Sequence, residues 1–119
     1  SAAKTSYVLN VAAFAMEQGI TSRKLNQMND EEVIAYITQI KGVGRWTAEM
    51  LLMFALGRED VFSADDLGIQ TAMRHLYKLD ITDKKDFRRQ ILSISQNWTP
   101  YRSYACMHLW AWKDGKGGV

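Results

Sequence analysis

Residues 37–48, ITQIKGVGRWTA, decide the fold. Two glycines in this stretch separate two segments in which apolar residues recur at helical spacing. On the amino-terminal side, Asn29 is a good N-cap, and Glu32 three residues later completes a capping-box pattern. On the carboxyl-terminal side, residues 45–56 are apolar all round in their second half, as in a helix within a domain. The glycines suit a tight turn with unusual backbone angles, so we expect a hairpin at residues 40–45.

The rest of the chain also has helical spacing, and we expect an all-α fold. The apolar positions of the predicted helices recur over residues 7–15, 69–79 and 87–92, and a last helix is predicted after the only proline, near residues 101–112. No segment alternates convincingly in the way that a half-buried strand does. We expect one domain over residues 1–113.

Residue type also predicts how these helices begin and how the chain ends. Asp65 or Ser63 is expected to cap the helix that contains Ile69, and Thr82 is expected to cap the next helix. Residues 114–119 are rich in glycine, so we expect a flexible tail.

The composition is that of one globular domain, with 119 residues of which 47% are hydrophobic and 24% charged. The formal net charge of +2 is compatible with nucleic-acid binding but does not demonstrate it. The single cysteine, Cys106, excludes an internal disulfide and a four-cysteine iron–sulfur or zinc site, and we expect it in the core. No apolar run approaches the roughly 20 residues of a membrane span, and no signal peptide opens the chain. A cytoplasmic location is therefore expected.

The glycine hairpin is a candidate site for a DNA phosphate. Backbone N–H groups at the start of the second helix would point outward, and the positive end of the helix dipole favours an anion. Such contacts hold a duplex without reading its sequence. The alternative is an ordinary helix–helix turn with a C-cap glycine, which is common. The residues expected at the DNA are Lys41, Gly42, Val43, Gly44, Arg45 and Thr47.

Two later segments complete a pattern with the hairpin. They are DVFSADD at residues 60–66 and WTPYRSYACMHLW at residues 98–110. Together with GVGRWTA at residues 42–48, in this order, they resemble the helix-hairpin-helix DNA glycosylase superfamily, and within it the 3-methyladenine DNA glycosylase II branch. The resemblance covers nearly the whole chain. It implies an enzyme of base-excision repair that hydrolyses the N-glycosidic bond of alkylated purines.

By this resemblance Asp66 is the catalytic carboxylate, and Asp65 is its neighbour, which caps the helix or contacts backbone. An alkylated purine is cationic and leaves readily, so the enzyme mainly has to stabilise an oxocarbenium-like sugar and orient water. The target base must first leave the stack and enter a pocket. The alternative is that both aspartates simply cap a helix.

The resemblance also implies that Trp46, Met50 and Trp110 line the base pocket. Indole faces attract a cationic base by stacking and by cation–π interaction, although tryptophan in a helical domain more often packs in the core. Close relatives can have an aromatic residue at the position of Met50, which leaves the substrate range open. Trp46 stands where bifunctional relatives carry a lysine that attacks the sugar, so a monofunctional enzyme without lyase activity is implied.

In the family the hairpin also holds a monovalent cation through main-chain carbonyls. The matching positions are Thr38, Ile40 and Val43, and this expectation of a structural Na⁺ or K⁺ rests on the resemblance. No other cofactor is expected to be required.

The remaining charged residues have plainer interpretations. His75 and His108 are expected as packed or surface residues, and Arg102 is expected to support the last helix or to contact DNA. A basic run on one predicted helix could contact phosphate, although a solvated helix face is the more common case. This run comprises Lys84, Lys85, Arg88 and Arg89.

The family's domain is longer at its amino end. Helices that precede Ala3 in the family complete one wall of the cleft and carry a side chain that wedges into the duplex. The chain is therefore expected to be the carboxyl-terminal portion of the domain, with weak or no activity alone. The expected partner is double-stranded DNA with a damaged base, bound by a monomeric full-length protein. The rival hypothesis is a non-enzymatic hairpin module, or an inactive fragment, with salt-sensitive DNA binding and no base release.

Overall fold

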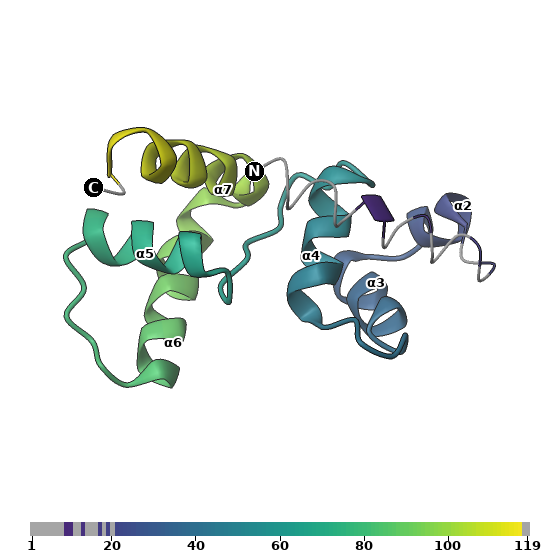
Figure 1. Cartoon of the computed structure of the whole chain (residues 1–119), viewed down its shortest axis with the longest axis horizontal. Helices are drawn as coiled ribbons and strands as arrows, with labels where there is room; N and C mark the ends of the chain where they lie inside the picture. The colour runs from purple at the N-terminus through teal and green to yellow at the C-terminus, as the bar shows by residue number, and fades with distance from the viewer. Residues whose placement is uncertain (1–8, 11–12, 14–16, 18, 20, 118–119) are drawn as a thin grey trace. The chain divides into compact units, whose positions relative to one another are not determined.

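The described part of the computed structural model is helical in all its regular elements (Figure 1). It comprises residues 9, 10, 13, 17, 19 and 21–117. The all-α prediction is confirmed for these residues, and the helix expected near residues 7–15 lies largely outside them. The chain is divided into two compact units, one up to Val61 and one from Phe62. No helix in the described part of the chain is long and apolar enough to cross a membrane.

The first unit contains α2 (Ser22–Asn26), α3 (Asp30–Ile37) and α4 (Arg45–Phe54), and α3 packs against α4. The predicted capping box at the start of α3 is confirmed. The Glu32 N–H donates to Asn29 Oδ1 at 2.8 Å, and the Asn29 N–H donates to Glu32 Oε1 at 2.9 Å. Such a cap stabilises a helix by about 1 kcal/mol and fixes where α3 begins.

The buried face of α4 includes Leu51, Leu52 and Met53, as the apolar sequence predicts. The prediction that the helix is buried all round is wrong at its end, where Phe54 is 38% exposed. The helix also ends two residues earlier than expected. The chain then turns through Gly57, whose φ of +65° is a conformation that glycine adopts without strain.

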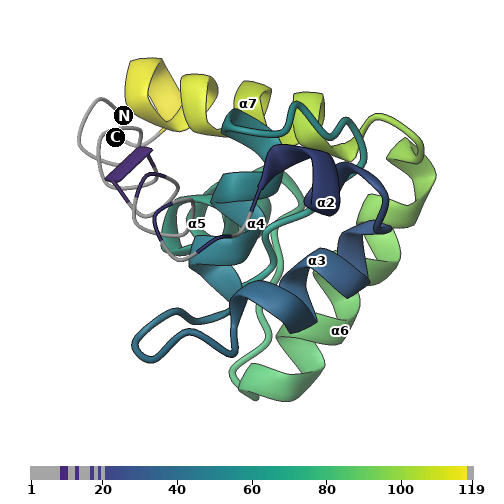
Figure 2. The same cartoon turned by 90° about the vertical axis from the view of Figure 1, so that its right-hand side faces the viewer.

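The second unit contains three longer helices: α5 (Leu67–Leu76), α6 (Lys84–Ser95) and α7 (Arg102–Trp112). Helix α5 packs against α7, as Figure 2 also shows. A 3-10 turn, Gln96–Trp98, leads from α6 towards α7. Where a flexible tail is predicted, the backbone continues as a π-helical turn, Lys113–Gly117, which contacts both α5 and α7.

The caps of α5 and α6 differ from the predicted ones. Asp66, rather than Asp65 or Ser63, is the N-cap of α5, and its side chain accepts from the Ile69 N–H. Neither Asp65 nor Ser63 directly precedes the first helical turn, so neither can take this role. In the same way Asp83, rather than Thr82, caps α6 and accepts from the Asp86 N–H. Each cap lies one residue closer to its helix than the nearest predicted residue.

Candidate active site

The hairpin consists of residues 38–44, which join α3 to α4 (Figure 2). The Val43 N–H donates to the Ile40 carbonyl at 3.0 Å and closes the turn. Gly42 has a φ of +87°, which confirms the predicted unusual backbone at this position. At Gly44 that prediction is wrong, because φ is −96° and ψ is −178°, an extended conformation open to any residue.

The structure gives Gly44 a different role, as the N-cap of α4. Gly44 has no side chain that could accept hydrogen bonds from the first turn of the helix. The N–H groups of that turn therefore have no side-chain cap from Gly44. Both hairpin glycines are exposed. Backbone donors at an exposed helix start are what the predicted phosphate contact requires.

The charged residues of the hairpin differ in their surroundings. Lys41 is exposed, whereas Arg45 is held by two carboxylates. The Arg45 guanidinium donates to both oxygens of Glu31, at 2.8 and 3.1 Å, and its Nε donates to Glu49 at 3.1 Å. The hydrogen bond from Arg45 lowers the pKa of the Glu31 carboxyl, and Glu31 in turn raises the pKa of Arg45. A phosphate at Arg45 must therefore compete with Glu31.

Three further residues that the sequence analysis assigned to the site lie on α4. Trp46 is half-buried, whereas Thr47 and Met50 are buried, Met50 with no exposed surface. Thr47 therefore does not present its side chain to a duplex in this structure. Met50 reaches a base only if its surroundings open.

Asp66 lies at the start of α5, where its carboxylate has two roles. Its Oδ1 accepts a hydrogen bond from the Ile69 N–H at 3.0 Å and one from Trp110 Nε1 at 2.9 Å. Both donors are N–H groups, which stabilise a carboxylate in its charged form. The residue is only 2% exposed. The structure thus brings together two residues, Asp66 and Trp110, that the resemblance placed in the site in different roles.

Gly68 is a site residue that the sequence analysis missed. A Cβ at this position would lie 3.1 Å from Asp66 Oδ1 and 3.2 Å from Trp110 Cδ1, closer than such atoms normally approach. The missing side chain therefore leaves room for the indole beside the carboxylate. The signal in the sequence is a glycine two residues after the aspartate, where a helix would normally disfavour it.

Asp65 has a different environment from its neighbour. It is exposed, and its Oδ1 accepts from Arg88 Nε at 2.9 Å. The expectation that Asp65 caps the helix or contacts backbone is not met by this pairing. The two adjacent aspartates are thus divided into one buried carboxylate and one surface ion pair.

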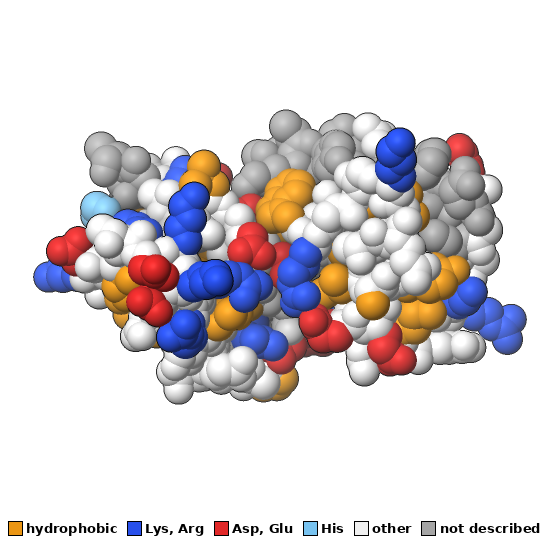
Figure 3. Space-filling view, turned by 90° about the horizontal axis from the view of Figure 1, so that it is seen from below, with side chains coloured by type: hydrophobic (Ala, Val, Ile, Leu, Met, Phe, Trp, Pro, Cys, Tyr) orange, Lys and Arg blue, Asp and Glu red, His pale blue; other side chains and the backbone are white. Residues whose placement is uncertain are grey.

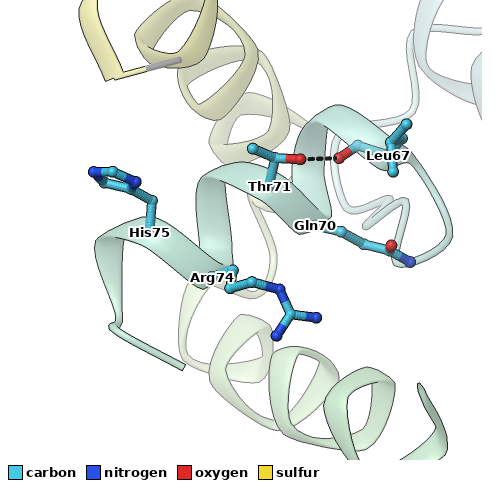
Figure 4. Close-up of a pocket in the computed structure, with 5 residues that line it drawn as sticks. All are labelled: Leu67, Gln70, Thr71, Arg74 and His75. Atoms are coloured by element: carbon cyan, nitrogen blue, oxygen red, sulfur yellow. Dashed lines mark hydrogen bonds between the residues drawn. The ribbon is translucent and has the colours of Figure 1, made fainter. Parts of the chain in front are cut away.

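Two of the hollows on the second unit are lined by described residues. One, of about 370 Å³, is lined by side chains of α5, with Thr71 and His75 on one side and Gln70 and Arg74 on the other (Figure 4). The other, of about 470 Å³, is lined by residues from α5, α6 and the segment between them, together with Asp65. Asp66 lines neither hollow.

The other candidate residues occupy ordinary positions. The exposed His75 ring lies 5.5 Å from the Trp112 ring, and His108 is exposed on α7. Arg102 is half-buried at the start of α7. Cys106 is buried, as predicted. None of these observations assigns a chemical role to the two histidines or to Arg102.

The expected cation ligands are the main-chain carbonyls of Thr38, Ile40 and Val43. The Ile40 carbonyl already accepts from the Val43 N–H, and its second lone pair is compatible with a cation. Among the described residues, no group of three acidic, histidine or cysteine side chains is arranged to hold a metal ion. Carbonyl ligation at the hairpin stays a prediction.

Comparison with known proteins finds similar sequences among the DNA-3-methyladenine glycosylases. DNA-3-methyladenine glycosylase 1 of Schizosaccharomyces pombe is 42% identical over 90 residues, which cover 76% of this chain and 38% of that protein. A DNA-3-methyladenine glycosylase of Bacillus subtilis is 31% identical over 107 residues, which cover 90% of this chain and 34% of that protein. The chain thus spans about a third of the length of these relatives.

Solved structures give a consistent result. The structure of the Schizosaccharomyces pombe 3-methyladenine DNA glycosylase in complex with abasic DNA matches with a TM-score of 0.75 and 37% identity. The match covers 92% of this chain and 53% of that chain. No family model matches the sequence.

Proposed function

The chain is homologous to one part of the DNA-3-methyladenine glycosylases, and from this premise we propose that it contributes the catalytic carboxylate of a monofunctional DNA glycosylase. The reaction is hydrolysis of the bond between an alkylated purine and its deoxyribose, in double-stranded DNA. The observation that supports this function best is the Asp66 carboxylate at the start of α5, which accepts a hydrogen bond from Trp110 Nε1.

The proposed chemistry needs one negative charge beside the sugar. When the bond from C1′ to the purine nitrogen breaks, its electron pair leaves with the cationic base, and positive charge develops on the sugar. The Asp66 carboxylate would stabilise that charge electrostatically. A water molecule then adds to C1′ and loses a proton, which leaves a free base and an abasic site.

The burial of Asp66 sets a condition on this mechanism. With 2% of the residue exposed, a nucleoside sugar cannot reach the carboxylate in the arrangement described. Groups around Asp66 must therefore move when an extruded nucleoside enters. Because the Trp110 N–H occupies Oδ1, Trp110 is one group whose displacement would change the carboxylate's environment.

Other parts of the proposal concern the hairpin. Its exposed glycines and the start of α4 would bind a phosphate of the strand, and carbonyls at Thr38, Ile40 and Val43 would hold a monovalent cation. Trp46, which replaces the lysine of bifunctional relatives, has no amine to form a Schiff base. The expected product is therefore an abasic site with an unbroken strand.

The test uses the intact natural protein that contains this sequence, with duplex DNA that carries methylated purines. We expect Asp66→Asn to lower the single-turnover rate of base release by about 100-fold or more, because the transition state loses a charge that stabilises it. The matched control is Asp83→Asn, the same substitution at the N-cap of α6. Asparagine caps a helix as well as aspartate does, so neither change removes a cap.

The outcomes separate the enzyme from the rival binding module. Base release that survives Asp66→Asn would refute the assignment of Asp66. A protein that binds DNA with strong salt dependence but releases no base would instead be a non-enzymatic hairpin module.

A further inference from the structure

The hollow between α5 and α6 is rich in positive charge. Four of the eight residues that line it are cationic, and Asp65 is the only acidic one. The four cations are Arg74, Lys84, Lys85 and Arg88. Figure 3 shows blue Lys and Arg side chains gathered on the left-hand part of the view, which is the second unit. The net charge of the chain is only +2, so this clustering is local.

Arg74 is positioned by neutral groups. Its guanidinium carbon lies 3.9 Å from the centre of the Phe87 ring, and its Nη1 donates to the Ile81 carbonyl at 2.9 Å. Neither partner carries a negative charge, so the positive charge of Arg74 is not neutralised by these contacts. The ring and the carbonyl thus hold a cation at the wall of the hollow.

The two lysines are exposed, and neither forms an ion pair with any residue that the structure describes. They are the first two residues of α6, where the positive end of the helix dipole disfavours cations. Asp83 and Asp86 offset part of this cost. Helix stability therefore does not explain why Lys84 and Lys85 stand here, whereas an anionic partner would.

Arg88 connects the hollow to the candidate catalytic segment. It pairs with Asp65, the residue next to Asp66, and both partners are about two-fifths exposed. Asp65 lines the hollow, and the Cα atoms of consecutive residues lie only about 3.8 Å apart. One edge of the hollow is therefore next to the backbone of Asp66. A DNA strand carries a phosphate about every 3.4 Å along the helix axis, so a strand engaged at Asp66 has further phosphates nearby.

We propose that the α5–α6 hollow binds phosphates of the DNA backbone, as a surface additional to the hairpin. This inference rests on the proposed function, because it takes DNA as the partner. The charge of the hollow matches a polyanion, and its volume of about 470 Å³ exceeds the needs of one phosphate group. Contacts of this kind would hold the strand without reading its sequence.

The experiment measures the affinity of the intact natural protein for undamaged duplex DNA as a function of salt concentration. Lys84→Gln/Lys85→Gln is expected to weaken binding roughly tenfold or more near physiological salt, and to reduce the slope of log affinity against log salt by about 2. Lys85→Gln alone is expected to reduce the slope by about 1. Thermal unfolding of each variant checks that the fold is retained.

The matched control is Arg89→Gln, which removes one positive charge from the same helix. Arg89 is exposed, pairs with Asp86 at 3.2 Å and does not line the hollow. It is expected to change affinity and slope much less than Lys85→Gln does. If Lys85→Gln and Arg89→Gln change the affinity and the salt slope equally, the effect is one of overall charge. If the double variant binds DNA like the wild type, the two lysines lie on a solvated helix face that does not contact DNA. Either result overturns the proposal.

Base release separates this inference from the proposed function. If base release depends on Asp66 but the lysine variants bind DNA like the wild type, the phosphate-binding role of the hollow is refuted and the proposed glycosylase function is retained. If no base is released but the lysine variants reduce the salt slope, the proposed glycosylase function is refuted and the phosphate-binding role of the hollow is retained. Where both hold, raising the protein concentration is expected to restore the release that the double variant loses.

Discussion

At the scale of single residues, the absence of a side chain at Gly68 shapes the candidate site. The hydrogen bond from Trp110 to Asp66 needs the indole edge in a space that a Cβ at Gly68 would share. Asp66 and Trp110 are separated by 44 positions, so periodicity and spacing give no sign that they touch. The motifs placed both residues near the site, but their contact could be found only in the folded chain.

Gly68→Ala is expected to destabilise the protein. Within a helix, alanine normally stabilises by about 0.5–1 kcal/mol relative to glycine. At Gly68 the added Cβ would approach Asp66 Oδ1 to 3.1 Å, so the indole and the carboxylate must shift, at a cost of about 1–3 kcal/mol. Denaturant unfolding followed by tryptophan fluorescence measures the change. A more stable variant would show that the space beside Trp110 adapts without cost.

At the scale of secondary-structure elements, the sequence predicts which helices form better than it predicts where they begin. The capping box of α3 could be predicted because only Asn29 precedes the helical pattern with a Glu three residues on. Before α6, by contrast, Thr82 and Asp83 are both good caps by residue type. Only the backbone at Asp83 decides between them.

Asp83→Ala is therefore expected to cost about 1 kcal/mol of stability, because the Asp86 N–H loses its acceptor. Thr82→Ala is the control, since Thr82 is exposed and is not the cap; it is expected to cost much less. Denaturant midpoints of the two variants give the comparison. A larger loss for Thr82→Ala would contradict the cap assigned to α6.

The Glu31–Arg45 pair links α3 to α4 and predicts a dependence on pH. The Arg45 hydrogen bond holds the pKa of the Glu31 carboxyl below its ordinary value of 4.5 in the folded protein. A lowered folded-state pKa gives stability that is present above the unfolded value and is lost as the pH falls through the folded one. Glu31→Gln should therefore lose less stability than the wild type when the pH falls below 4.5.

Denaturant unfolding over a series of pH values on both sides of 4.5 measures this difference. Glu59→Gln, which removes an exposed carboxylate outside the pair, serves as the control. Parallel pH profiles for Glu31→Gln and the wild type would mean that the pair contributes nothing to stability.

At the scale of the whole molecule, the candidate functional groups are divided between two units. The hairpin lies in the first, whereas Asp66, Trp110 and the cationic hollow lie in the second. Composition predicted a small net positive charge, but it could not predict that four cations share one hollow, because that depends on packing. Nor could it predict that carboxylates hold Arg45, since Glu31 is 14 positions away.

Burial of the single cysteine predicts how the folded chain reacts with thiol reagents. Cys106 has no exposed surface, and a thiol must become accessible to react. In a polypeptide of this sequence, labelling is expected to be slow in native buffer and at least about 100-fold faster in denaturant. The time course of labelling measures both rates. Equally fast labelling in native buffer would show that the second unit opens readily around α7.

The cap of α5 offers a practical route to a captured complex. One side chain both starts that helix and supplies the charge proposed for the reaction. Alanine at Asp66 would remove both contributions, and a loss of turnover could then reflect a damaged fold. Asparagine keeps an acceptor for the Ile69 and Trp110 N–H groups while removing the charge. A silent yet well-folded protein of that kind could retain damaged DNA long enough for a crystal of the uncut lesion.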